Sequence, residues 1–588
     1  MAQMRLALAQ VNPTVGDLAG NARAVRAWAA KASERGAHLV AFPEMMLTGY
    51  PVEDLALRAS FVEASRAALA QLAADLVADG LGDLPVVLGY LDHEPYVSTK
   101  ATREVTRPLP QNCAAVLYQG QVKARYAKHH LPNYGVFDEF RNFAPGNHLT
   151  VVRIGDIDMA IAICEDLWQD GGPVAKTREA GAELLLVING SPYEEDKDDV
   201  RYELVARRAA EAGCTLAYLN MVGGQDELVF DGDSLVVNAA GQILARGPQF
   251  DEDLLIVDLD LEPSTVEVPD GSGEGLLHVT LSDAPIAPYA AQPATLAPRL
   301  DPVGEVYRAV QLGLHDYVRK NGFRSVLLGV SGGIDSALVA TIAADALGGE
   351  NVVAISNPSK YSSQGSRDDA AELAQNLGLD YRVIPIDPLV SAFLDTVKLT
   401  GVSEENLQAR VRAVVWMGLG NQEGHLILTN SNKSEVSVGY STIYGDSVGG
   451  YAPLKDVPKT MVWGLARWRN AEAERRGEKP PIPLASINKA PSAELSPGQV
   501  DQDSLPPYEL LDALLDRYVG GAQGRAELVG AGFDPSVVDE VVGLVDRAEW
   551  KRRQFAPGPK ISPLAFGRDR RLPITSRWRE QDSQLRQP

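Results

Sequence analysis

Short apolar segments alternate with helical stretches along the first ~265 residues of the chain. HLVAFPE, PVVLGYL, DMAIAIC and AELLLVING are apolar and read as strands, whereas NARAVRAWAAKASERGA has a helical pattern. Apolar strands that are covered by helices belong to sheets buried on both faces. This part of the chain is therefore predicted to be an α/β domain.

The character of the sequence changes after residue 268. Residues 269–300 are rich in Pro, Ala and Gly without a clear period, so we expect an interdomain linker there. From residue 301 a helix, the strand SVLLGVS, a glycine turn and the helix DSALVATIAADALG follow in the order of a doubly wound sheet. We therefore predict domains at 1–268 and 301–570, and a polar tail at 571–588.

Composition excludes several classes of protein. The net charge of −23 disfavours a general nucleic-acid binder, and no apolar stretch is long enough for a membrane helix. Three cysteines are too few for a disulfide framework, and no Cys or His cluster has zinc spacing. The N-terminus MAQMRLALAQVNPTVGD lacks the pattern of a signal peptide. We expect a cytoplasmic protein.

Residues 327–336, LLGVSGGIDS, place a glycine turn between an apolar strand and a helix. Glycines let backbone N–H groups approach an anion, and a helix N-terminus favours negative charge. Ser331 and Ser336 can bond phosphate, and Asp335 can hold Mg²⁺. The Gly-Lys-Ser/Thr ending of a Walker loop is missing. The alternative is a tight turn with a helix cap.

SGGIDS resembles the signature of the N-type ATP pyrophosphatases, which adenylate their substrates. NPSKYSSQGSRDDA, LTNSNKSEVSVGYSTIYGD, INKAPSAELSPGQ and KRRQFAPGPK are similar to the NAD synthetase branch. The resemblance implies a Rossmann-like parallel sheet and Mg²⁺ at Asp335 and Glu435. The implied ATP-binding residues are Gly329, Ser331, Gly332, Gly333, Asp335, Ser336, Asn430 and Lys459. The residues implied for nicotinate adenine dinucleotide (deamido-NAD) are Asn406, Arg410, Arg412, Asp446, Glu494 and Lys551.

In the first half, IAICEDLW places Cys164 directly before two carboxylates, which disfavour a thiolate. Cys164 is therefore either an inert core residue or a nucleophile that other segments activate. Glu44 ends the apolar run LVAFPE, and Lys128 precedes the loop LPNYGVFDE. Each of these residues alone has a structural explanation.

Together and in this order, Glu44, Lys128 and Cys164 resemble the nitrilase superfamily, an αββα sandwich. More narrowly, PNYGVFDE, ICEDLW and NGSPY resemble the glutaminase half of glutamine-dependent NAD synthetases. The resemblance implies Cys164 as nucleophile, Glu44 as base and Lys128 as oxyanion stabiliser. The implied glutamine-binding residues are Tyr50, Tyr134, Glu165, Trp168, Ser191 and Lys197. Gly190 in place of Ala, Trp168 in place of Phe and a long loop at 94–110 depart from the family.

The two halves form one expected reaction. Glutamine is hydrolysed through a Cys thioester, and the ammonia is channelled to adenylated nicotinate adenine dinucleotide, giving NAD⁺, AMP, pyrophosphate and glutamate. ATP and glutamine are co-substrates, with Mg²⁺ and no tightly bound organic cofactor. The family implies a homo-oligomer, an octamer built from synthetase-domain dimers. The alternatives are an adenylating amidotransferase acting on another carboxylate or nucleotide, and a half that has lost catalysis.

Overall fold

The computed structural model describes residues 2–94, 109–264, 271–273, 275–578 and 580. The chain divides into two compact units, residues 1–225 with 230–300, and residues 226–229 with 301–588. Most of the expected loop at 94–110 and the end of the expected tail lie outside the described residues.

The first sheet of the first unit has the strand order β14-β1-β2-β3-β4-β5. Its strands are β1 (Ala2–Gln10), β2 (Leu39–Ala41), β3 (Val86–His93), β4 (Pro110–Tyr118), β5 (Gln121–Ala127) and β14 (Asp253–Leu261). β1, β2 and β3 are parallel, and the remaining pairs are antiparallel. The carboxyl ends of the parallel strands therefore lie along one edge of the sheet.

The second sheet has the order β13-β12-β9-β8-β7-β6-β16-β15, with β7, β8 and β9 parallel. Its strands are β6 (Leu149–Ile154), β7 (Ile157–Ile163), β8 (Leu184–Asn189), β9 (Thr215–Asn220), β12 (Leu235–Val237), β13 (Ile243–Arg246), β15 (Gly271–Gly273) and β16 (Leu276–Ser282). β10 (Val222–Gln225) and β11 (Leu228–Asp231) form a separate two-stranded sheet. β12 and β13 pair antiparallel across the segment NAAGQ.

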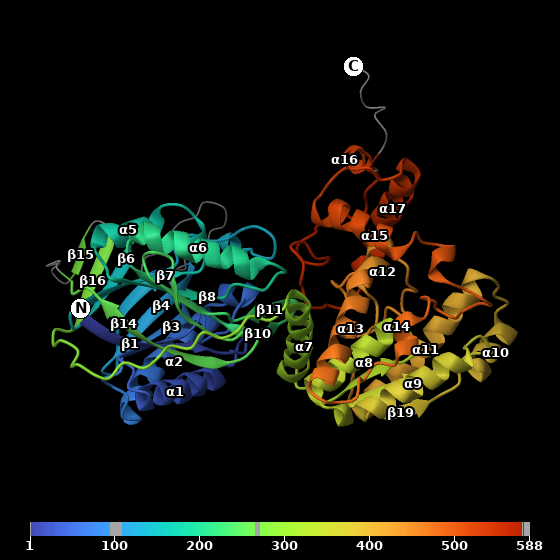
Figure 1. Cartoon of the computed structure of the whole chain (residues 1–588), viewed down its shortest axis with the longest axis horizontal. Helices are drawn as coiled ribbons and strands as arrows, with labels where there is room; N and C mark the ends of the chain where they lie inside the picture. The colour runs from blue at the N-terminus through green and yellow to red at the C-terminus, as the bar shows by residue number, and fades with distance from the viewer. Residues whose placement is uncertain (1, 95–108, 265–270, 274, 579, 581–588) are drawn as a thin grey trace, which may run out of the picture. The chain divides into compact units, whose positions relative to one another are not determined.

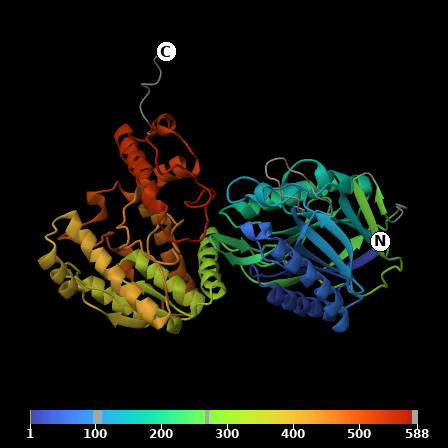
Figure 2. The ribbon, with the colours of Figure 1, turned by 180° about the vertical axis from the view of Figure 1, so that it is seen from behind.

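The two sheets stack between two layers of helices. The helices of this unit are α1 (Leu18–Glu34), η1 (Glu53–Leu57), α2 (Ala59–Ala78), α3 (Glu139–Asn142), α4 (Glu165–Trp168), α5 (Gly172–Ala180) and α6 (Lys197–Ala212). α1 and α2 lie on one side of the strands and α5 and α6 on the other (Figure 1), and the view from behind shows the same layers (Figure 2). Met4, Leu6 and Leu8 of β1 face the core between the sheets, whereas Ala7 and Ala9 face the core under α1 and α2. The predicted αββα sandwich is confirmed.

The segment 269–300, expected to be a linker, begins as part of this sandwich. β16 pairs parallel with β6, and β15 pairs antiparallel with β16. Residues 283–300 contain no helix and only an isolated bridge between Leu296 and Arg246. The Pro- and Ala-rich composition that indicated a linker begins only after residue 283, so it did not describe the strand before it.

The second unit is built on a four-stranded parallel sheet of order β19-β18-β17-β20. Its strands are β17 (Val326–Gly329), β18 (Val352–Ser356), β19 (Asp380–Val383) and β20 (Leu426–Ile427). The chain winds outward from β17 to β19 and then returns to β20 on the other side of β17. Ligands bind at such a reversal in open α/β sheets. The predicted doubly wound fold is confirmed.

Helices surround this sheet and extend beyond it. They are α7 (Pro302–Lys320), α8 (Ile334–Leu347), η2 (Gly349–Asn351), α9 (Gln364–Leu377), α10 (Asp387–Thr396), α11 (Val402–Glu423), α12 (Lys433–Val438), α13 (Lys459–Arg475), α14 (Leu484–Asn488), η3 (Asp501–Asp503), α15 (Tyr508–Leu515), η4 (Asp516–Gly520), α16 (Arg525–Gly530), α17 (Pro535–Arg547) and α18 (Glu549–Arg552). α8 and α11 contact β17, and α12, α15 and α17 share a second apolar core. Among the described residues, no helix combines the length and apolarity needed to cross a membrane.

Candidate active sites

Glu44, Lys128 and Cys164 meet inside the first unit. Glu44 follows β2, Lys128 follows β5 and Cys164 follows β7, so the two stacked sheets each contribute to the site. Glu44 and Lys128 are fully buried and Cys164 is 4% exposed. The Lys128 Nζ lies 2.8 Å from Glu44 Oε1. Charge on either residue alters the pKa of the Cys164 thiol, so the three groups act on one another electrostatically.

Cys164 lies at a sharp turn between β7 and α4. Its backbone has φ 45° and ψ −96°, a region that non-glycine residues rarely adopt. Its N–H donates to the Ile188 carbonyl at 3.1 Å. Unfavourable backbone geometry of this kind persists only where surrounding contacts enforce it, and it clusters at functional sites. The turn argues against an inert core cysteine.

The electrostatic surroundings keep the Cys164 thiol neutral at rest. Burial and the Glu44 carboxylate raise its pKa well above the ordinary value, and Lys128 offsets only part of this. Lys128 therefore does not by itself make the resting sulfur a thiolate. The proton has to leave the sulfur during attack, and Glu44 is the buried carboxylate that can accept it.

A second carboxylate completes this site and was not assigned from the sequence. Glu139, at the start of α3, places Oε2 2.9 Å from Lys128 Nζ, and its Oε1 accepts a hydrogen bond from the Tyr50 hydroxyl at 2.9 Å. Burial raises the pKa of Glu139 to about 7, although the Lys128 ammonium opposes the shift. Two carboxylates therefore share one ammonium. In the sequence, Glu139 is the last residue of PNYGVFDE, and this position was the only indication of its role.

Further contacts fix the orientation of Glu44. The Asn112 amide donates to Oε1 and the Gly190 N–H donates to Oε2, each at 2.7 Å. A Cβ at Gly190 would lie 2.9 Å from Tyr50 and 3.2 Å from the Met221 sulfur. The glycine that departs from the family pattern therefore leaves room for the packing around Glu44 in this chain.

The expected glutamine-binding residues fall into two groups. Glu165 accepts from the Tyr134 hydroxyl at 2.8 Å and from the Gln169 amide at 3.1 Å, and Tyr134 is 55% exposed. The Lys197 ammonium donates to the Pro192 carbonyl at 2.9 Å, and burial lowers its pKa. The Cys164 thiol affects the pKa of both Tyr134 and Lys197, so both side chains lie near it.

The other expected glutamine-binding residues have packing or positioning contacts. Tyr50 is buried with its hydroxyl on Glu139, and the Ser191 N–H donates to Asn220 at 2.9 Å. Trp168 packs against the core under α5 and α6. Burial lowers the pKa of His129, which follows Lys128, to about 4.

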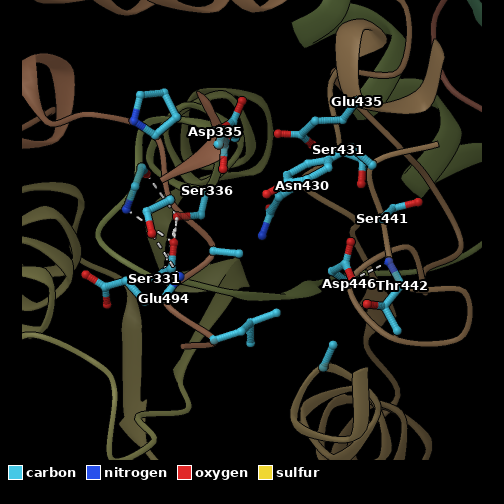
Figure 3. A pocket seen from close by; sticks show the side chains of 18 of the residues that line it. Ser331, Asp335, Ser336, Asn430, Ser431, Glu435, Ser441, Thr442, Asp446 and Glu494 are labelled. Atoms are coloured by element: carbon cyan, nitrogen blue, oxygen red, sulfur yellow. Dashed lines mark hydrogen bonds between the residues drawn. The ribbon is translucent and has the colours of Figure 1, made fainter. Parts of the chain in front are cut away.

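In the second unit, a cavity of about 740 Å³ opens at the carboxyl end of β17 (Figure 3). Residues 331–333 lead from β17 into α8, whose first residues include Asp335 and Ser336. Gly333 N–H donates to the Ser331 hydroxyl at 3.2 Å, and Ser331 N–H donates to the Ser336 hydroxyl at 3.2 Å. Gly332 has φ +81°, and a Cβ there would collide with the Ser366 carbonyl. The loop has the compact geometry expected of a phosphate-binding turn.

Three charged groups face one another beside this loop. Lys459, at the start of α13, makes a short ion pair with Asp335, and its Nζ lies 3.8 Å from Glu435 Oε1. The Asn432 amide also donates to Asp335 at 2.8 Å. Burial and Asp335 raise the pKa of Glu435 well above its usual range, and Lys459 opposes this. The two carboxylates therefore need positive charge, which the lysine supplies in part.

Most of the other predicted nucleotide-binding residues line the same cavity. Asn430 donates to the Gly329 carbonyl at 2.8 Å, and its oxygen has no hydrogen-bond partner among the described residues. The Lys551 ammonium donates to two backbone carbonyls at 2.9 Å. The predicted residues that line the cavity are Gly329, Ser331, Gly333, Asp335, Ser336, Asn406, Arg410, Arg412, Asn430, Glu435, Asp446, Lys459, Glu494 and Lys551. Gly332 shapes the turn without lining the cavity.

Charged residues that were not assigned from the sequence also line the cavity, and two of them, Lys489 and Asp501, lie in one segment. Lys489 pairs with Asp369 at 2.8 Å and donates to the Ser366 hydroxyl at 2.9 Å. Asp501 accepts from the Tyr508 hydroxyl at 2.7 Å. Both lie in the segment INKAPSAELSPGQVDQ, whose spacing alone does not distinguish them from solvated charges.

Comparisons with known proteins match both units in order. The carbon–nitrogen hydrolase family matches residues 5–265 and the NAD synthase family matches residues 306–555. The glutamine-dependent NAD(+) synthetase of Rhodobacter capsulatus is 45% identical, covering 98% of this chain and 99% of that protein. The one from Thermotoga maritima is 42% identical, covering 99% and 100%.

A solved structure extends this likeness to three dimensions. The glutamine-dependent NAD+ synthetase from Acinetobacter baumannii, in complex with adenosine diphosphate, aligns with a TM-score of 0.71 at 37% identity, covering 99% of this chain and 100% of that chain. The likeness covers both units of the chain. The chain therefore belongs to the family of glutamine-dependent NAD⁺ synthetases.

Proposed function

We propose that the cluster around Cys164 hydrolyses the side-chain amide of glutamine. The buried contact of Lys128 with Glu44, next to a thiol held at a positive φ, is the observation that carries this proposal. Cys164 attacks the amide carbon as its proton passes to Glu44. The ammonium of Lys128 stabilises the oxyanion of the tetrahedral intermediate.

The intermediate then collapses to products. Glu44 returns the proton to the leaving nitrogen, which departs as ammonia and leaves a glutamyl thioester on Cys164. Water, deprotonated by Glu44, attacks the thioester and releases glutamate. The second carboxylate, Glu139, keeps Lys128 protonated and in place. This step needs no cofactor.

Two charged residues fit the α-amino acid part of glutamine. Glu165 has both oxygens on hydrogen-bond donors, Tyr134 and Gln169, which orient its charge toward an incoming ammonium. Lys197 has a buried ammonium that donates to the Pro192 carbonyl, so it suits the α-carboxylate. We assign Glu165 to the α-amino group and Lys197 to the α-carboxylate.

In the second unit, we propose that the loop at 331–333 binds the phosphates of ATP and that the rest of the cavity takes nicotinate adenine dinucleotide. A volume of about 740 Å³ is at the upper end for small-molecule sites, in keeping with two nucleotides. Asn430, with an unpartnered oxygen, suits the adenine amine. Arg410 and Arg412 on α11, with Lys551, supply positive charge for the dinucleotide.

Asp335 and Glu435 are suited to Mg²⁺. Among the described residues no cluster of three or more His, Cys, Asp or Glu side chains could hold a metal by itself. Mg²⁺ is normally held by one or two carboxylates together with substrate phosphates and water, so this pair fits. The ion would neutralise the phosphates, and Lys459 is placed to contact them when it leaves Asp335.

The proposed transfer of ammonia to the second site follows from the reactivity of ammonia. Adenylation activates the nicotinate carboxylate, and only neutral ammonia attacks it, whereas ammonia in neutral water is mostly protonated. We therefore propose that ammonia passes between the units shielded from water. The overall reaction converts nicotinate adenine dinucleotide, ATP, glutamine and water into NAD⁺, AMP, pyrophosphate and glutamate.

We propose that the chain is a homo-oligomer, an octamer built from dimers of the second unit. Large apolar side chains are exposed on neighbouring helices of this unit, which is unusual for a surface facing water. They are Leu389, Phe393, Val402, Val414 and Met417 of α10 and α11. Asn406 and Arg410 of the cavity lie on the same α11, so a second copy on this face would adjoin the site.

The domain boundaries and location are also proposals. We propose catalytic domains at 1–268 and 301–570; the boundary between the two units after residue 300 supports the start of the second domain, whereas β15 and β16 extend the first unit beyond residue 268. All three cysteines are unpaired and buried, which suits a reducing compartment, so we propose a cytoplasmic location.

Replacing the nucleophile tests the division of labour. Cys164→Ala is expected to lower glutamine-dependent NAD⁺ synthesis by about 10⁴-fold or more, with synthesis from added ammonia retained. Both rates are measured as NAD⁺ formed from nicotinate adenine dinucleotide and ATP. Equal loss of both activities would overturn the assignment, and activity only on another carboxylate would overturn the substrate.

A further inference from the structure

Asp166 is a buried carboxylate that the reaction described above does not use. It lies two residues after Cys164 in α4 and is fully inaccessible to solvent. Its neighbour Glu165 meets Tyr134, on the side assigned to the substrate. Asp166 has different partners, and all of them are donors from the chain itself.

Four donors converge on the two oxygens of Asp166. Oδ2 accepts from the Tyr126 hydroxyl at 2.6 Å and from the Ile163 N–H at 3.0 Å. Oδ1 accepts from the N–H groups of His129 at 3.0 Å and His130 at 2.8 Å. Tyr126 and the two histidines lie on either side of Lys128, and Ile163 directly precedes Cys164. One carboxylate therefore connects the segment that carries the lysine to the segment that carries the thiol.

We propose that Asp166 is a positioning residue for amide hydrolysis, which holds Lys128 and Cys164 at their working separation by joining the end of β5 to the end of β7. This inference rests on the proposed roles of Cys164 and Lys128. Asp166 contacts neither the assigned substrate groups nor the reacting atoms, so it acts only through the backbone segments that it binds.

The backbone on both sides needs such a partner. The positive φ of Cys164 is unfavourable and is kept only when neighbours enforce it. The N–H groups of His129 and His130 follow a buried lysine and need an acceptor. Because all four partners donate, the ionised carboxylate fits best. Burial raises the pKa of Asp166, and the bonds from Tyr126, His130 and Ile163 oppose that shift.

The test is Asp166→Asn in the full-length protein. The amide has the same size, but either orientation turns its NH₂ group toward a backbone N–H, so one side of the connection is lost. The kcat for glutamine-dependent NAD⁺ synthesis is expected to fall about 10²-fold, as a misplacement near 1 Å does. The KM for glutamine should stay within about threefold, because the assigned substrate contacts are unchanged. Synthesis from added ammonia should be unchanged.

Asp158 provides a matched control at the opposite end of β7. It is 1% exposed and accepts from Arg153 at 2.8 and 2.6 Å, from the Ser264 hydroxyl at 2.8 Å and from His278 at 3.2 Å. Asp158→Asn therefore disrupts a comparable buried network far along the strand from Cys164. It should lower the melting temperature similarly, with a glutamine-dependent kcat within about twofold of the parent protein.

Tyr126→Phe is the second variant. It removes one of the four donors and keeps three, so the expected loss of kcat is about three- to tenfold. If Asp166→Asn does not fold, an unchanged kcat in Tyr126→Phe overturns the proposal. A kcat within about threefold of the parent in Asp166→Asn, or an equal loss in Asp158→Asn, also overturns it. Cys164→Ala distinguishes failure of this inference from failure of the proposed glutaminase mechanism. If that variant keeps glutamine-dependent synthesis, the proposed mechanism is wrong as well.

Discussion

In the first unit the reacting groups are buried and already paired, whereas in the second unit they surround a cavity of about 740 Å³. Lys128 is enclosed by two carboxylates with side-chain exposures of 0% and 5%. Lys459 also lies between two carboxylates, but Asp335 and Glu435 are 18% and 17% exposed. The same arrangement of one ammonium and two carboxylates therefore occurs in a closed and in an open setting.

The difference fits the substrates proposed for the two sites. Glutamine is small, and its hydrolysis needs only one amide placed against a fixed set of groups, so the charges can be arranged in advance. Two nucleotides and a metal ion bring their own charges. A site for them keeps partly exposed carboxylates and lysines whose partners change when the ligands arrive.

The largest expected loss of stability comes from removing the enclosed lysine. In Lys128→Met, Glu44 and Glu139 lose the shared ammonium, so glutamine-dependent kcat/KM should fall about 10³-fold. The free energy of unfolding should fall by about 3–5 kcal/mol, because two carboxylates remain buried without a counter-charge. Activity assays and denaturant titration measure both.

Lys459→Met is the matched variant for the open setting. It should abolish synthesis from glutamine and from ammonia, but destabilise the protein less, because water can solvate Asp335 and Glu435. An equal loss of stability in the two variants would break the comparison between a closed and an open site.

Asp335→Asn tests the second unit alone. The variant removes one proposed Mg²⁺ ligand and one partner of Lys459, so NAD⁺ synthesis from either nitrogen source should fall about 10²–10³-fold. Release of glutamate from glutamine should persist. An amino-acid assay measures this release. Asp380→Asn, at an exposed position of β19, is the control. If glutamate release falls in parallel, the two sites depend on each other more than their separate geometry indicates.

Glu139→Gln should have an intermediate effect. The amide can keep the contact with Tyr50, but it no longer offsets the charge of Lys128. We expect a loss of about 10–10²-fold in glutamine-dependent kcat, with ammonia-dependent synthesis retained. Glu63→Gln on the surface of α2 is the control. Full activity in Glu139→Gln would mean that Glu44 alone holds the lysine.

The smallest effect concerns the resting thiol. Because burial and Glu44 raise the pKa of Cys164, iodoacetamide should alkylate it at pH 7.5 at least about tenfold more slowly than free cysteine. The rate should still rise with pH above 9, because deprotonation is incomplete there. Peptide mapping separates Cys164 from Cys113 and Cys214. A fast rate with a plateau below pH 8 would show a preformed thiolate and a stronger influence of Lys128.

Parts of both sites were accessible from sequence patterns because they depend on local order. The glycine loop at 331–333 lies between a strand and a helix, and that order alone predicts its geometry. Glu139, Lys489 and Asp501 were not assigned, since their roles come from contacts across segments. The strand β16 was missed for a related reason: its partner β6 lies more than a hundred residues earlier.

The amino-acid order determined the two α/β units and the positions of Glu44, Lys128 and Cys164 after strands, because hydrophobic periodicity and turn residues act over a few positions. Tertiary structure decided how the charges balance. The fold of the connection after β5 brings Glu139 to Lys128, and the stacking of two sheets brings Asp166 to the residues that follow the lysine. Burial keeps the thiol of Cys164 protonated until a base removes its proton. Electrostatic interactions depend on distance and solvent access, which no local pattern contains.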